Sequence, residues 1–150
     1  MSRRALLAAP PDVLRWSPRS SGHGDCAVAA IELACGVTYE VALAGALEQD
    51  PHVLTQGLTL SEIRHIIRTF GYAGKVLKKG TYELDDDTTG ILAVKQPHVP
   101  DSEHVVYVWE GRIIEPKADR RQLWLDAEQF LHHYKYRAGS LLTIVRAATS

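Results

Sequence analysis

The segment from Cys26 to Gly36 constrains the fold of this chain more than any other. It is rich in alanine and almost wholly apolar, with Glu32 as its only charged side chain. Asp25 can cap the start of a helix here, and Gly36 can end it. A helix that is apolar on every side is buried among other elements. We therefore predict a buried helix over this segment.

Two more helices are expected after it. Thr38 can cap a helix over Tyr39–Gln49, which the proline of Asp50-Pro51 stops. The residues Thr59-Leu60-Ser61-Glu62 form a capping box, which marks the start of a third helix. Its apolar residues keep helical spacing, at positions Ile63, Ile66, Ile67 and Phe70, before Gly71 ends it.

The pattern changes to short β-like runs after Gly74. Clusters of Gly, Pro and Asp separate these runs, which cover Lys75–Lys78, Ile91–Lys95, His104–Trp109, Arg112–Glu115 and Ser140–Arg146. One more short helix is expected over Asp126–His133. Helices that come first and antiparallel strands that follow predict an α+β fold with segregated layers.

The length and the charge of the chain limit its class. A chain of 150 residues suits one domain, and we expect residues 1–21, rich in Pro, Arg and Ser, to form an extended arm before a domain over 22–150. The net charge of −1 gives no electrostatic reason to expect nucleic acid or an anionic membrane as partner. No apolar run approaches the ~20 residues that span a bilayer. A cytoplasmic location is the resulting expectation.

The two cysteines, Cys26 and Cys35, are expected to stay apart. They lie nine residues apart in the same predicted helix, which puts them on opposite sides and about 13 Å apart along the axis. A disulfide needs Cα atoms within about 7 Å. Two free thiols fit a reducing compartment.

Cys26 lies where a cysteine becomes reactive, at the start of the predicted helix. The unpaired backbone N–H groups of a first helical turn stabilise a thiolate and also a developing oxyanion. Gly22 and Gly24 leave the approach open to a substrate backbone. The alternative is a small core residue, because unpaired cysteines are among the most buried residue types. For Cys35, at the far end of the helix, the core role is the expectation.

His104 is the best candidate for a base among the seven histidines. It opens a strand that turns at Glu110-Gly111, and a two-residue turn makes His104 and Glu115 diagonal neighbours on one face. A carboxylate in that position holds the imidazole tautomer and favours the imidazolium. The alternative is a surface pair on a hairpin. No pair of residues shows the spacing of metal ligands, so we expect neither a metal nor a cofactor.

Several segments together resemble a known family. Asp25–Ala30 followed by Gly36–Glu40 resembles the nucleophile helix and following turn of papain-like cysteine peptidases. Gly57–Ile63 is similar to their third helix, and His104–Pro116 to their histidine strand, which ends in an acidic residue followed by proline. The nearest group is the bacteriocin (double-glycine leader) processing peptidases with their small stand-alone bacterial and phage relatives. The resemblance spans about residues 20–118.

The resemblance implies a papain-like α+β fold and a cysteine hydrolase. Cys26 would be the nucleophile, His104 the general base and Glu115 the orienting third member, where the family usually has Asp. The family also places a Gln six residues before the nucleophile as an oxyanion donor, and here that position holds Ser20. Losing such a donor can cost about 10²–10³ in rate.

The segment before the nucleophile is therefore the expected oxyanion and substrate-binding region. Ser20 can donate through its hydroxyl, with Ser21 or His23 as substitutes, and Gly24 and Asp25 complete the segment.

The resemblance and the site residues are compatible with three functions. The first is a peptidase that acts on a peptide or protein through a thioester. The second is acyl transfer of the transglutaminase or amidase kind by the same triad. The third is a non-catalytic papain-like module that binds a peptide or another protein.

Overall fold

The computed structural model describes residues 25–97, 104–115 and 123–147. The helices in these ranges are α1 (Asp25–Cys35), α2 (Tyr39–Gln49), α3 (Val53–Gln56), α4 (Leu60–Thr69) and α5 (Ala127–Tyr134). The strands are β1 (Tyr72–Leu77), β2 (Gly90–Lys95), β3 (His104–Trp109), β4 (Arg112–Ile114), β5 (Leu123–Trp124) and β6 (Arg137–Arg146). The expected division into an arm over 1–21 and a domain over 22–150 stays a prediction.

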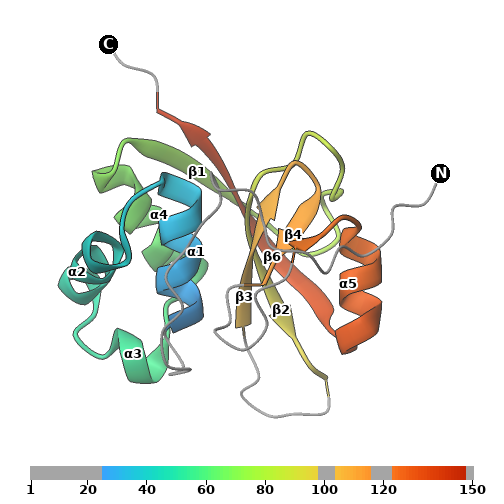
Figure 1. Ribbon diagram of the computed structural model, residues 1–150, viewed down its shortest axis with the longest axis horizontal. Helices are drawn as coiled ribbons and strands as arrows, with labels where there is room; N and C mark the ends of the chain where they lie inside the picture. Colours follow the sequence, from blue (N-terminus) through green and yellow to red (C-terminus); the bar gives the residue numbers. More distant parts are fainter. Residues whose placement is uncertain (1–24, 98–103, 116–122, 148–150) are drawn as a thin grey trace.

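One sheet organises the molecule. Within the described ranges its six strands follow the order β1-β6-β2-β3-β4-β5, and every neighbouring pair is antiparallel. The last strand therefore lies between the first two. Helices α1–α4 gather on one side of the sheet and α5 on the other (Figure 1). The expected α+β fold, with the N-terminal helices segregated from a C-terminal antiparallel sheet, is confirmed.

The apolar helix that dominates the sequence is α1, and it is buried as predicted. Its residues Ala27–Ile31 are at most 4% exposed. They pack in a core that α1, α2 and α4 form with one face of the sheet. A second core lies on the opposite face, under α5. Burying apolar surface on both faces holds the sheet between its helices.

The predicted helix boundaries agree with the structure. Thr38 caps α2, and Thr59 and Glu62 form the expected capping box at the start of α4. The last helix is shifted by one residue, because Asp126 stands outside it as its cap and accepts from the N–H groups of Glu128 and Gln129. The short helix α3 was not predicted, since its four residues carry no period.

Several strand boundaries were wrong. The strand predicted from Lys75 begins at Tyr72, and the one predicted from Ser140 begins at Arg137. Gly74 lies inside β1 rather than before it and pairs with Ile144. A Cβ at this position would meet a Leu142 methyl at 2.7 Å, so the close packing favours glycine here. Long-range pairing explains these extensions, because the start of β1 pairs with the end of β6 and the start of β6 pairs with the end of β2. The two-residue strand β5 was not predicted.

The length and the apolar character of the helices bear on whether one of them could span a membrane. In the part of the chain that the structure describes, no single helix is long and apolar enough to cross a membrane. The segments Cys26–Cys35 and Tyr39–Gln49 would pass that test as a pair, by length and composition alone, although the chain bends by 119° between them.

Candidate active site

The start of α1 and the start of β3 bring the two expected reactive groups together. Cys26 is the second residue of α1 and is half-buried. His104 is the first residue of β3 and is 7% exposed. The Cys26 thiol hydrogen-bonds the His104 side chain. Neither described cysteine forms a disulfide, as the spacing in one helix predicts.

A third group lies behind the imidazole. His104 Nε2 hydrogen-bonds Glu115 Oε1, and the Glu115 carboxylate is fully buried. Because Nε2 faces the carboxylate, Nδ1 is the ring nitrogen left for the thiol. The three side chains therefore form one chain of hydrogen bonds, from sulfur through imidazole to carboxylate.

The β3–β4 hairpin sets this arrangement. Glu110 and Gly111 take positive φ angles of 49° and 80°, which is the two-residue turn that joins twisted strands tightly. The resulting register pairs Trp109 with Arg112 and Val108 with Ile113, as predicted. β4 ends at Ile114, so Glu115 lies just beyond the strand rather than in it. Its side chain still reaches the imidazole, so the alternative of a surface pair is wrong.

A backbone group adds to the environment of the thiol. The N–H of Val105 donates a hydrogen bond to Cys26 Sγ. The sequence analysis missed this contact, although a strand that begins at His104 must place the next N–H close to the imidazole. The donor stabilises the ionised form of the sulfur more than the neutral form.

The pKa values of the pair move in opposite directions. Burial raises the pKa of Cys26, but the hydrogen bond and the charge of His104, with the Val105 N–H, outweigh it and leave that pKa below its ordinary value. Burial lowers the pKa of His104, but contacts with Cys26 and Glu115 outweigh it and raise that pKa to about 9. A lowered thiol pKa beside a raised imidazole pKa favours a thiolate–imidazolium pair at neutral pH.

An aromatic side chain covers the imidazole. The Tyr136 ring lies 6.1 Å from the His104 ring, tilted by 32°, and it rests in turn on Phe130 at 5.7 Å. Tyr136 precedes β6 and is distant in sequence from the hairpin, so no local pattern could have predicted the contact. The contact is part of what buries the imidazole.

The remaining predicted residues have different outcomes. Ser20, Ser21, His23 and Gly24 lie outside the described residues, and so does the side chain of Asp25, the first residue of α1. The expected oxyanion and substrate-binding segment therefore stays a prediction. Among the residues that can be placed, no three His, Cys, Asp or Glu side chains are grouped as metal ligands would be.

Cys35 lies at the other end of α1. It is 7% exposed in the core, and burial raises its pKa to about 12. Its backbone carbonyl accepts a hydrogen bond from the Tyr72 hydroxyl. The prediction of a structural core cysteine is confirmed, and the two thiols of this chain have opposite chemical character.

Comparison with solved structures shows a similarity in fold. No family model matches the chain, and no curated protein matches it. A solved structure described as a double glycine motif protease from an AMS/PCAT transporter, in complex with the leader peptide, is similar with a TM-score of 0.60 and 14% identity. The similarity covers 96% of each chain. At this identity it establishes the fold, which is papain-like as expected.

Proposed function

We propose that this protein is a cysteine peptidase in which Cys26 is the nucleophile, His104 the general base and acid, and Glu115 the residue that orients the imidazole. The observation that carries the proposal is the continuous chain of hydrogen bonds through these three side chains. A buried thiol whose pKa is lowered by a histidine is uncommon in a purely structural role.

The proposed reaction begins with the thiolate–imidazolium pair. Cys26 Sγ attacks the carbonyl carbon of a peptide bond and forms a C–S bond. The imidazolium of His104 gives its proton to the amine nitrogen as the C–N bond breaks, which leaves a thioester. A water molecule then gives a proton to His104 and attacks the thioester. The C–S bond breaks, the acid product leaves and the thiolate returns.

The oxyanion that forms in both steps needs donors. The backbone N–H of Cys26 belongs to the first turn of α1, where N–H groups have no partner inside the helix. Ser20 or Ser21 is the proposed second donor, in the position that the family fills with Gln. The helix dipole of α1 adds a positive field at the same place.

A peptide is the proposed substrate. The similar solved structure is a complex with a leader peptide, and the similarity in fold extends over 96% of each chain. The acyl-transfer and non-catalytic alternatives predict other outcomes when the chain is incubated with peptides.

Incubation of the chain with a proteome-derived peptide library, read by mass spectrometry, tests the proposal. We expect new peptide termini with the wild-type chain and none with Cys26→Ala, because only the former has the nucleophile. A peptide aldehyde should add reversibly to Cys26 and not to Cys35. Products that carry an added amine would indicate acyl transfer. Equal product patterns from the two chains would refute the proposal.

A further inference from the structure

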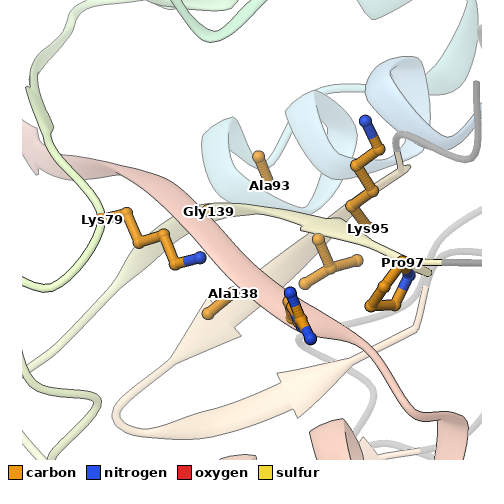
Figure 2. Close-up of a pocket in the computed structure, with 8 residues that line it drawn as sticks. Lys79, Ala93, Lys95, Pro97, Ala138 and Gly139 are labelled. Carbon is orange, nitrogen blue, oxygen red and sulfur yellow. The ribbon is translucent and has the colours of Figure 1, made fainter.

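A cavity of about 380 Å³ lies where the end of β2 meets the start of β6 (Figure 2). Its floor is made by small or apolar residues, Ala93, Val94, Pro97, Ala138 and Gly139. Three long cationic side chains stand around it, Lys79, Lys95 and Arg137, and all three are exposed. Among the described residues that line it, none is acidic.

A β-bulge creates the cationic rim. Leu92 pairs with Leu141 but Val94 pairs with Ala138, so β6 contains one extra residue between them. The bulge brings Arg137 opposite Lys95. Directly opposed residues share a face of the sheet, and like charges in that position destabilise it. The register therefore holds Lys95 and Arg137 side by side, and their repulsion lowers the stability of the fold.

The described part of the chain does not neutralise these charges. Neither Lys79, Lys95 nor Arg137 forms an ion pair with any residue that the structure describes. A neighbouring cavity shares Lys79 and Arg137 and has acidic residues in its wall, Glu83, Asp85 and Glu128, yet none of them pairs with the two cations. An anion bound in the first cavity would relieve the repulsion.

The cavity is close to the proposed nucleophile. Val94 lies directly opposite His104 in the β2–β3 register, and neighbouring strands are about 4.8 Å apart. Ala93 packs against the core that contains α1, at whose start Cys26 lies. Lys95 is two residues further along the strand, so it points to the same side of the sheet as Ala93. Lys95 therefore lies on the face of the sheet that carries α1, at the end of β2 that is next to His104.

We propose that this cavity is a specificity subsite that binds acidic side chains of the peptide substrate. In an extended peptide, alternate side chains lie about 6.6 Å apart, so two carboxylates can reach different rim cations. Small or aliphatic side chains between them match the apolar floor. The inference rests on the proposed peptidase function and names the substrate class, an acidic peptide.

The inference is tested by measuring peptide binding to the full chain carrying Cys26→Ala. This variant lacks the proposed nucleophile, so it cannot cleave the peptide during the measurement. The probes are fluorescein-labelled Glu-Leu-Glu-Leu-Glu and its neutral counterpart Gln-Leu-Gln-Leu-Gln, followed by fluorescence anisotropy at low and at high salt. In the same background, one variant replaces Lys79, Lys95 and Arg137 by Gln. The matched control replaces three exposed cations outside the cavity, Arg64, Lys75 and Lys78, by Gln.

We expect the acidic peptide to bind about tenfold more tightly than the neutral one, and high salt to weaken that preference. The cavity variant should lose about tenfold in affinity for the acidic peptide. The control variant should stay within about twofold. The melting temperature of the cavity variant should not fall, because the substitutions remove a repulsion.

Four results would overturn the inference: equal affinity for the two peptides, equal losses in the two variants, no binding of either peptide, or stronger displacement of the probe by single-stranded DNA than by unlabelled acidic peptide. The alkylation rate of Cys26, measured in the wild-type chain, separates the two proposals. An activated thiol without acidic preference refutes only the subsite. Acidic peptide binding beside an ordinary thiol refutes only the peptidase.

Discussion

Replacing His104 with alanine perturbs the whole proposed site, because the imidazole contacts both other groups. Cys26 then loses the hydrogen bond and the positive charge that lower its pKa, while burial, the largest influence and one that raises the pKa, remains. The N–H of Val105 is the favourable contact that stays. We expect the pKa of Cys26 in His104→Ala to reach or exceed its ordinary value of 9.0.

The size of the effect follows from the fraction of thiolate. At pH 6 a thiol with an ordinary pKa is roughly 0.1% ionised, whereas a thiol paired with an imidazolium is largely ionised. A thiolate of lower pKa is also a weaker nucleophile, with a Brønsted coefficient of about 0.5. The loss of thiolate outweighs the gain in nucleophilicity, so the alkylation rate at pH 6 should fall. The inflection of the pH–rate profile should move upward.

Iodoacetamide alkylation between about pH 5 and pH 10, followed by mass spectrometry of the Cys26 peptide, measures both quantities. Cys35 serves as a slow reference in the same chain, since it is buried and its pKa is raised to about 12. His104→Ala leaves the buried Glu115 carboxylate without its imidazole, which can cost about 3–5 kcal/mol of stability. A double variant, His104→Asn with Glu115→Gln, removes that charge and keeps the test valid. A profile of Cys26 unchanged in both variants would refute the reasoning.

Three further perturbations have defined outcomes. The pKa of His104, raised to about 9 from 6.5, gives stability that is fully present below pH 6.5 and is lost as pH rises through 9. In Cys26→Ala the contacts with Glu115 stay and those with Cys26 are lost, so urea unfolding should show a loss of stability between pH 6 and pH 10 that is smaller than the about 3 kcal/mol of the full shift, and equal stabilities would contradict this. Burial is the largest influence on the pKa of His104 and lowers it, so Tyr136→Leu, which opens the imidazole to water, should raise that pKa, whereas Tyr136→Phe should leave it unchanged in an NMR titration. Ile31→Ala should cost about 2–5 kcal/mol because Ile31 is fully buried in α1, and a loss below about 1 kcal/mol would show that α1 is not the centre of the core.

The parts of the site that sequence analysis predicted are those that local geometry fixes. A two-residue turn determines the register of the β3–β4 hairpin, so the diagonal placement of His104 and Glu115 follows from the spacing alone. The reactive end of α1 follows from the composition of the segment, although Asp25, expected to cap the helix, is its first residue. These are short-range relations, and each depends on fewer than about a dozen residues.

The parts that sequence analysis missed depend on long-range pairing. The insertion of β6 between β1 and β2 places Tyr136 beside His104 and brings Arg137 opposite Lys95. The β-bulge in β6 places Arg137 opposite Lys95, and no sequence pattern shows where that bulge occurs. Sequence periodicity could identify β6 as a strand, but not its neighbours or its register.

The protonation state of the Cys26–His104 pair is the property on which the proposed function depends most. Nitrogen-15 NMR of the His104 ring in the wild-type chain measures it directly, with Cys26→Ala as the comparison. The structure predicts a doubly protonated imidazole at neutral pH that titrates near pH 9, and a lower titration point once the thiol is removed. A neutral imidazole at pH 7, with the same titration point in both chains, would contradict the thiolate–imidazolium pair and the peptidase built on it.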